Sequence, residues 1–547
     1  MDFNKIFEKL YQASVSEAWQ EFEKLCAYPE QLQISLLNFI LSENKTTEFG
    51  IRHDFATIKD VESFQQKVPL SSWKDYEKYS LLMQEGKEDM LFPGKPESFI
   101  MTSGTAGKKK LIPESATGRR LKEITDKLRR NFSFNADIIQ GKFLPLVNKA
   151  SLGYTKGGTP YGTASGLIMA GSSPELIQTF SYPPAILKTD NNESMDYMLM
   201  RFSLVSDVRM IIGNNIARMG KLAEFAEINA SNLINDIRTG TIDSSYDIAS
   251  DIIAELQKHL LPDPKRADSL QKIIDDGDSF IPANYWPNLK VICCWLSGSV
   301  GASVQNVKNI FPDNIKYLDY GYGASEGRFN IPYTPGKTRG TLTVHAAFYE
   351  FIPVDNNSPN PPVLLAHELK KGKSYRLVIT TAAGLYRYEM KDIIKVDGFT
   401  GSTPDIVFVS KWGDIGNIVG EKLSGTTICE AAARVAKNTG FEIKHICAVT
   451  KASPSRYIFC LEFINSPGNH KDIKDIEIAL DDELRKDIGY GNRRRDNLLL
   501  ELEIKVMPEG WLDSLYEEKM QATGNTMAQI KLPVIYEDVP EMKQFKS

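Results

Sequence analysis

The sequence has few cysteines and histidines, and neither is spaced as in a metal or redox motif. Its six cysteines are scattered and include no Cys-x-x-Cys pair, which argues against a zinc site and a thioredoxin-like motif. The six histidines show no ligand spacing, and His345 and His367 lie in apolar stretches typical of structural histidines. Reduced thiols in a core are typical of the cytoplasm, so we expect a cytoplasmic protein.

Long apolar runs and an excess of positive charge are also missing. No apolar run reaches about 18 residues, the length of a membrane span, and the start Met1–Lys5 lacks the pattern of a signal peptide. Lysine and arginine total 65 against 70 acidic residues, a formal net charge of −5, whereas nucleic-acid-binding domains are basic. We therefore expect small-molecule partners, no membrane and no nucleic acid, and we expect a monomer.

What is present is the composition of a large globular protein. Hydrophobic residues make up 42% and charged residues 25% of 547 positions, as in folded domains. Because this length exceeds one ordinary core, we expect a large domain and a smaller one. The patterns favour the α/β class, with β-sheets flanked by helices in residues 1–410 and a smaller, mobile α+β domain in residues 426–547.

The stretch Phe99–Pro113 is a candidate phosphate-binding loop. Its two apolar triplets predict strands, and between them lie Gly104, Gly107, small hydroxyl residues and Lys108–Lys110. Glycine lets the backbone approach a ligand closely, and successive backbone N–H groups form a concave anion site. The spacing is not that of a Walker A motif. A glycine hairpin with solvated lysines explains the stretch equally well.

Two predicted strands lead into glycine-rich turns. Val291–Leu296 is an unbroken apolar run, which predicts a strand buried on both faces, and Ser297-Gly298-Ser299 follows it. Ile315–Tyr320 predicts a second strand, and Gly321–Gly327 follows that one. In α/β proteins, nucleotides bind where strands end in such turns.

Three other features have two interpretations each. Asp392 is a lone acid in an apolar, strand-like stretch, so its partner is either a ribose or a neighbouring Arg387 or lysine. The glycine-rich stretch 153–166 is either a flexible loop or a pocket wall. The helix expected over residues 115–132 carries four arginines, mostly a solvated face, of which one could reach a carboxylate substrate.

The chain changes character at Lys411. Lys411–Lys422 contains three glycines and mixed charge, which predicts a hinge over residues 411–425. Beyond it, helices and strands alternate as in a small domain of split βαβ character. Within this domain we expect Arg493–Arg495 to lie in a solvated loop.

The order of these signals resembles that of adenylate-forming enzymes and, within them, the Gretchen Hagen family of acyl acid amido synthetases of plant auxin and jasmonate metabolism. The similar stretches run from Phe49 to Lys531 and cover nearly the whole chain. They include Met101–Thr105, Trp286–Asn288, Tyr322–Glu326, Tyr349–Pro353 and Leu385–Tyr388 with Asp392. Thr102 and Ala106 replace usual serines and Lys391 replaces a usual glycine, which indicates a divergent branch.

The resemblance implies that the protein uses ATP and Mg²⁺. Ser103, Gly104 and Thr105 would hold the ATP phosphates, and Ser325 would bond the α-phosphate. Glu326 would hold Mg²⁺, a hard cation that prefers carboxylate and phosphate oxygens.

The same resemblance implies a site for the nucleoside. Tyr322 would stack on adenine, with Gly298 and Ser299 near the edge of the base. Gly323 belongs to the same ATP-binding motif as Tyr322. Asp392 would accept hydrogen bonds from the ribose hydroxyls.

The implied reaction has two steps. A small carboxylic acid attacks ATP to give acyl-AMP, and the amine of an amino acid, or another amine, then displaces AMP. Lys422 and Lys531 would approach the α-phosphate and the reacting carboxylate, and with Glu326 they are the predicted catalytic residues. Two alternatives are transfer to a thiol such as coenzyme A and a non-catalytic nucleotide-binding protein, the latter disfavoured because every expected charged group is present.

Overall fold

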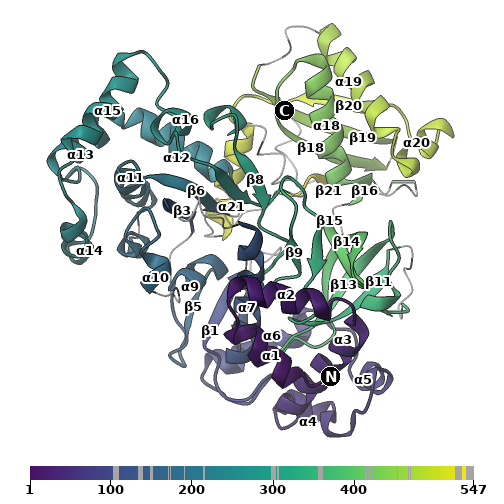
Figure 1. Cartoon of the computed structure of the whole chain (residues 1–547). Coiled ribbons are helices and arrows are strands. Elements are labelled where there is room, and N and C mark those ends of the chain that lie inside the picture. Colours follow the sequence, from purple (N-terminus) through teal and green to yellow (C-terminus); the bar gives the residue numbers. More distant parts are fainter. Residues whose placement is uncertain are drawn as a thin grey trace.

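The computed structural model shows lobes of helices arranged around β-sheets (Figure 1). The N-terminal helices lie at the bottom of the view, a helix-rich region at the upper left and the C-terminal part at the upper right. The residues that the structure describes are 1–102, 110–133, 140–147, 152–170, 172, 174–189, 191–213, 216–296, 304, 307–354, 356, 361–412, 415–416, 418–419, 421, 423–452, 454–465, 467, 470–523 and 532–537. Among these residues, no helix is both long and apolar enough to cross a membrane.

The N-terminal helices pack against the largest sheet. Helix α2 begins with a capping box, in which Ser14 and Glu17 each accept the backbone N–H of the other. Phe7 of α1 and Phe22 of α2 join the same hydrophobic core as Phe351 of the sheet. These helices are α1 (Phe3–Gln12), α2 (Val15–Leu25), α3 (Pro29–Asn44), α4 (Glu48–Arg52), η1 (Phe55–Thr57), α5 (Val61–Lys67) and α6 (Trp73–Gln84).

The candidate phosphate loop is flanked by the two predicted strands, which form an antiparallel pair with Met101 opposite Leu111. Residues 103–109 between them lie outside the described residues. The sheet has the order β2-β1-β5-β4, and the predicted helix α7 follows it directly. The elements are β1 (Ser98–Thr102), β2 (Lys110–Glu114), α7 (Ala116–Ser133), β4 (Gly153–Tyr154), β5 (Pro160–Gly162) and α9 (Ala164–Ala170).

In the parallel sheet of order β3-β6-β7-β8, the two strands that precede the predicted glycine-rich turns, β7 and β8, lie side by side. All four residues of β7 are buried, as the unbroken apolar run predicts. Ile292 and Cys294 face one hydrophobic cluster, while Val291 and Cys293 face another. The strands are β3 (Lys142–Leu146), β6 (Val208–Gly213), β7 (Val291–Cys294) and β8 (Lys316–Asp319). The helices of this region are α10 (Pro174–Ile177), η2 (Pro184–Lys188), α11 (Asn192–Ser203), α12 (Ala217–Ile228), α13 (Ala230–Thr239), α14 (Ser250–Leu256), η3 (Gln257–His259), α15 (Pro264–Asp275), α16 (Pro282–Tyr285) and η4 (Lys308–Ile310).

The largest sheet is antiparallel and has the order β12-β11-β13-β14-β15-β10-β9. Its β14–β15 hairpin sets Asp392 opposite Lys411. Since facing residues of such strands lie close together, a cation stands beside the predicted ribose-binding acid. The elements are β9 (Asn330–Pro332), β10 (Gly340–Leu342), β11 (Phe348–Pro353), β12 (Leu364–Leu365), η5 (Ala366–Glu368), β13 (Ser374–Thr380), β14 (Tyr388–Thr400) and β15 (Thr403–Lys411).

The C-terminal part is a smaller α+β unit with a sheet of order β20-β19-β18-β21. Helix α18 is capped by Ser424 at its start and by Gly440, at a φ of 77°, at its end. With the helix-flanked sheets before it, this unit confirms the predicted fold class. The elements are β16 (Ile415–Gly416), β17 (Leu423–Ser424), α18 (Gly425–Thr439), β18 (Ile443–Ala452), β19 (Ser455–Phe463), α19 (His470–Leu484), α20 (Ile488–Arg495), β20 (Glu503–Val506), α21 (Trp511–Thr523) and β21 (Ile535–Glu537).

The prediction of a solvated loop at Arg493–Arg495 is wrong. These residues form the last turn of α20, and Arg494 is only 6% exposed. Its guanidinium donates to both carboxylate oxygens of Asp481 on α19 and to the Leu499 carbonyl. A buried, fully bonded arginine ties two helices together, whereas a run of arginines by itself is typical of a surface.

Candidate active site

The turn after β8 is held at the edge of the parallel sheet by Asp319. One carboxylate oxygen accepts from the Gly321 N–H and the other from the Leu296 N–H, both at 2.8 Å. The Trp295 indole N–H donates to the Gly321 carbonyl at 3.0 Å. These bonds join the chain that leaves β7 to the turn that leads into Tyr322.

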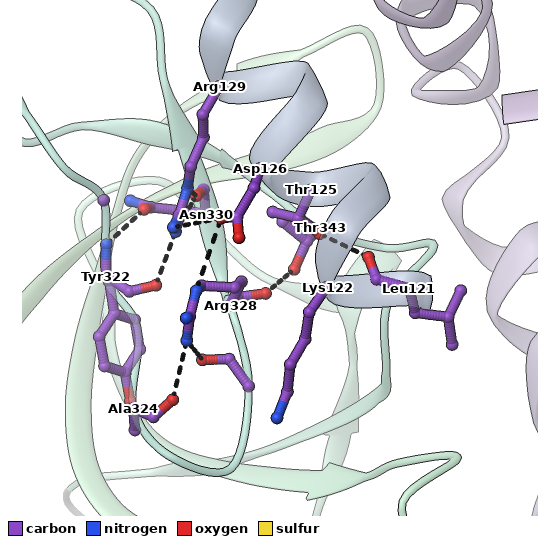
Figure 2. A network of polar contacts seen from close by, with 12 residues as sticks. Leu121, Lys122, Thr125, Asp126, Arg129, Tyr322, Ala324, Arg328, Asn330 and Thr343 are labelled. Carbon is purple, nitrogen blue, oxygen red and sulfur yellow. Dashed lines mark hydrogen bonds and ion pairs between the residues drawn. The ribbon is translucent and has the colours of Figure 1, made fainter. Parts of the chain in front are cut away.

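Helix α7 also holds this turn. Arg129 donates to the Tyr322 carbonyl at 3.2 Å and to the Asn330 carbonyl at 2.8 Å. Figure 2 shows Arg129 and Lys122 projecting from α7 toward the chain that carries Tyr322 and Ala324. Gly321 has a φ of 88°, and a Cβ there would lie 2.6 Å from the Arg129 guanidinium, so this position needs glycine.

Three of the four arginines of this helix have different surroundings. Arg119 pairs with Glu97 and Glu123, and Arg120 pairs with Glu8, on partly exposed faces. Arg129, in contrast, is 8% exposed and bonded to backbone carbonyls. It supports the turn and does not stand ready for a carboxylate substrate.

Asn330 was not among the predicted site residues, yet it fixes the backbone of Tyr322. Its side-chain oxygen accepts from the Tyr322 N–H at 2.7 Å, and its amide donates to the Ile406 carbonyl at 3.0 Å. The residue is fully buried. A buried asparagine at a strand start gives little signal in one sequence, because its partners are backbone groups.

Tyr322 and Asp392, predicted from separate motifs, meet in the structure. The Tyr322 hydroxyl donates to Asp392 at 2.6 Å, and its ring packs against Phe329 and Phe408 with centroids 4.8 and 5.1 Å away. Asp392 is 2% exposed and forms an ion pair with Lys411. The base and the ribose of one nucleoside are also neighbours, so one nucleoside would contact both Tyr322 and Asp392.

Arg387, the other candidate partner of Asp392, lies elsewhere. Its guanidinium donates to both carboxylate oxygens of the buried Glu350, at 2.9 and 3.1 Å. It also donates to the carbonyls of Gln65 and Val68. This pair anchors the N-terminal helices to the sheet, so the protein partners of Asp392 are Lys411 and Tyr322.

Gly323 to Glu326 form the tip of a tight turn. Gly323 pairs with Arg328 in an isolated antiparallel bridge, which leaves Ser325 and Glu326 between the two sides of the turn. The Ser325 carbonyl accepts from Lys122 of α7 at 3.1 Å, and Lys122 also pairs with Glu114. Arg129 and Lys122 of α7 thus each bond a backbone carbonyl of the Tyr322–Glu326 motif, those of Tyr322 and Ser325.

Glu326 has the surroundings of a carboxylate that a cation would stabilise. Burial raises the pKa of Glu326, and Asp392 raises it further, whereas Lys411 and Lys110 lower it. In the part of the chain that the structure describes, no group of three or more His, Cys, Asp or Glu could hold a metal. Mg²⁺ in nucleotide sites needs only one or two carboxylates, since phosphates and water complete its ligands, so Glu326 fits this ion.

A small cavity of about 20 Å³, room for about one water molecule, lies beside Glu326. Gly118 and Lys122 of α7 line it on one side, and Ala346 and Tyr349 on another. The cavity therefore borders the candidate Mg²⁺ ligand and is lined by both small and large side chains.

Several predicted site residues fall outside the described residues, so their roles stay predictions. They are Ser103, Gly104, Thr105, Gly298, Ser299, Lys422 and Lys531. The described ones, Tyr322, Gly323, Ser325, Glu326 and Asp392, lie on one turn and on the strand facing it.

Family models match most of the chain. The GH3 family N-terminal domain matches residues 18–316, the GH3 family central domain residues 340–411 and the GH3 family C-terminal domain residues 426–540. This chain belongs to the GH3 family. The predicted family is thereby confirmed.

Curated GH3 relatives are similar over nearly their whole length. A jasmonoyl–L-amino acid synthetase, JAR4 of Nicotiana attenuata, is 26% identical over 96% of this chain and 95% of its own. The indole-3-acetic acid-amido synthetase GH3.4 of Arabidopsis thaliana is 25% identical over 97% and 93%. The 4-substituted benzoates–glutamate ligase GH3.12 of the same plant is 24% identical over 97% and 95%.

Solved structures show the same fold. A GH3.15 acyl acid amido synthetase in complex with 2,4-DB aligns with a TM-score of 0.81 and 20% identity, over 96% of this chain and 95% of its own. A 2-hydroxyisobutyryl-CoA ligase in the postadenylation state aligns with a TM-score of 0.52 and 12% identity, over 97% and 91%. The GH3 fold of this chain is thus related to that of adenylate-forming enzymes.

Proposed function

We propose that this protein is an AMP-forming acyl acid amido synthetase. It activates a small carboxylic acid as acyl-AMP with ATP and then joins the acyl group to the amine of an amino acid. The GH3 relatives are synthetases that conjugate acids to amino acids, which supports this class of reaction. The observation that carries the proposal is the contact between Tyr322 and Asp392 beside Glu326.

The nucleotide site is built from one turn and one facing strand. Adenine stacks on the Tyr322 ring, and the ribose hydroxyls donate to Asp392, whose second neighbour is Lys411. The Ser325 turn faces the phosphates. Ser103, Gly104 and Thr105 hold the remaining phosphate oxygens through backbone and hydroxyl donors.

Glu326 would hold Mg²⁺, and the bound ion would offset the negative charge of the phosphates. In the first step, a carboxylate oxygen of the acid attacks the α-phosphorus, and the bond to pyrophosphate breaks. Lys422 and Lys531 stabilise the charge that gathers there, so positioning and electrostatics supply most of the catalysis.

In the second step, the amine nitrogen attacks the acyl carbonyl, the bond to AMP breaks and the nitrogen releases its proton to solvent. The two steps need different groups around one carbonyl. A movement of the small domain at the hinge, residues 411–425, would replace the groups of the first step by those of the second. The acyl group would enter beside α7 and Ala346, where the small cavity next to Glu326 would have to widen to admit it.

Acid-dependent ATP–pyrophosphate exchange tests the first step. The protein is incubated with ATP, Mg²⁺, labelled pyrophosphate and each member of a panel of aliphatic, aromatic and hydroxylated acids, with a reaction lacking acid as control. We expect label in ATP only with the acids that fit the pocket. A folded protein that exchanges with no acid would contradict adenylation.

The products of the second step separate the alternatives. Each active acid is offered mixed amino acids or coenzyme A, and the products are identified by mass spectrometry. We expect amides with amino acids and no thioester. A thioester alone would make the protein an acyl-CoA ligase, and tight ATP binding without exchange would indicate a non-catalytic nucleotide-binding protein.

A further inference from the structure

Asp319 is a buried acid next to the nucleotide site that none of the predicted motifs includes. It is the last residue of β8, and its side chain reaches back to the chain leaving β7. Each of its two carboxylate oxygens accepts one backbone N–H, from Leu296 and from Gly321. It therefore bridges the two strand ends from which the predicted adenine-binding segments start.

We propose that Asp319 is a positioning residue for ATP. Its carboxylate sets the spacing between the chain at Leu296 and the turn at Gly321, and so the place of the Tyr322 ring. This inference rests on the proposed ATP site at Tyr322 and Asp392. Asp319 itself need not touch the nucleotide.

The bonds around Gly321 show why both carboxylate oxygens matter. The Gly321 N–H is held by Asp319 and its carbonyl by Trp295, while Arg129 holds the next carbonyl, that of Tyr322. Each of these three backbone groups thus has its own side-chain partner. An amide side chain in place of the carboxylate would offer one acceptor only and would turn its own N–H₂ toward a backbone N–H.

Keeping the Asp319 carboxylate charged costs solvation free energy, because the side chain is buried. Burial raises the pKa of Asp319 to about 6, although both amide bonds and Arg129 lower it. The other titratable groups that face it are the thiols of Cys293 and Cys294 on β7, whose pKa values burial also raises, so they are neutral at neutral pH. Acidification through about pH 6 therefore protonates Asp319 and removes one acceptor from the bridge.

Binding of α,β-methylene ATP with Mg²⁺, followed by calorimetry, tests this role without knowledge of the acid substrate. At about pH 8 we expect Asp319→Asn to weaken binding roughly tenfold, the effect of losing one charge-assisted hydrogen bond. Asp236→Asn is the matched control. Asp236 is also buried and accepts two hydrogen bonds, from Tyr197 and Thr241, but lies on α13, so its Kd should stay unchanged.

The ratio of the two dissociation constants, Asp319→Asn over wild type, carries the specific readout. It should fall toward one below about pH 6, because the wild-type carboxylate then carries a proton. Titration of the nucleotide and of Glu326 affects both proteins and cancels in the ratio. Equal Kd values at about pH 8, or a raised ratio that does not change with pH, would overturn the inference.

A second variant covers the case in which Asp319→Asn does not fold. Trp295→Phe removes the hydrogen bond to the Gly321 carbonyl from the same turn, and we expect a several-fold higher Kd. An unchanged Kd in Trp295→Phe, together with an unfolded Asp319→Asn, would assign Asp319 to stability alone and overturn the inference. If the wild-type protein itself does not bind the analogue, the proposed function fails, and this result is distinct from binding that is equal in wild type and variant.

Discussion

Lys531 is the residue whose replacement we expect to affect the chemistry most. Its ammonium would face the charge that builds on the α-phosphate, so Lys531→Ala should lower acid-dependent ATP–pyrophosphate exchange by roughly 100- to 1,000-fold. Lys437→Ala, at the exposed end of α18 in the same domain, is the matched control and should exchange normally. Circular dichroism checks that both variants fold, and normal exchange in Lys531→Ala would remove this lysine from the site.

His345 is one residue through which stability depends on pH. It is 1% exposed and lies 3.1 Å from the Thr125 hydroxyl, as expected of a structural histidine. Burial lowers the pKa of His345 from 6.5 to about 3. The imidazole is therefore neutral in the fold but protonated in the unfolded chain between these values, so its contribution to stability is complete above about pH 6.5 and is lost as the pH falls toward 3.

The measurement is the free energy of unfolding in urea at a series of pH values. His345→Gln keeps a polar side chain without a titrating group, so its stability should depend less on pH between about 6.5 and 4 than that of the wild type. Parallel pH curves for the two proteins would show that His345 does not titrate as its burial implies.

At the scale of elements, the junction of α19 and α20 contains a buried ion pair between Arg494 and Asp481. Arg494 is 6% exposed and bonded to Asp481, whereas the side chain of its neighbour Arg495 is 73% exposed. Arg494→Ala removes the hydrogen bonds of Arg494 to Asp481, which keeps Arg485 and Tyr490 as partners, so we expect a loss of about 1.5–3 kcal/mol of unfolding free energy. Arg495→Ala should change it by less than about 0.5 kcal/mol, and equal effects of the two changes would contradict the assignment.

Elements with a strong pattern could be predicted from the sequence. The hairpin of β1 and β2, the buried strand β7 and the helix α7 follow from apolar runs, a glycine turn and helical spacing. The buried end of α20 could not be predicted in this way. A run of three arginines does not reveal that Arg494 meets Asp481, which is 13 residues away.

The residues of the candidate site also divide into those that sequence patterns predict and those that they do not. Tyr322 and Asp392 could be found because their motifs are short and local. The choice of Lys411 over Arg387 as the partner of Asp392 depends on the register of β14 and β15, which bulges shift. Arg129 bonds to backbone carbonyls, and such partners leave no mark in a single sequence.

At the scale of the molecule, the small domain touches the large one through α21 and α12. Lys221 of α12 lies 3.4 Å from Asp513 of α21, and Lys444 lies 3.2 Å from the same carboxylate. The side chains of Lys221 and Asp513 are 44% and 35% exposed, and such pairs contribute about 1 kcal/mol or less. An ion pair this weak would let the small domain leave its position during the reaction.

A covalent bridge between α12 and α21 should hold the small domain in one position relative to the large domain. In the double variant Lys221→Cys and Asp513→Cys, a short cleavable bismaleimide would hold α21 against α12. If the two steps need different positions of the small domain, the bridged protein should keep either ATP–pyrophosphate exchange or amide formation from supplied acyl-AMP, and lose the other. Cleavage of the linker should restore the lost step, and wild-type protein treated with the reagent is the control. A bridged protein that performs both steps at the wild-type rate would show that the small domain does not move between them.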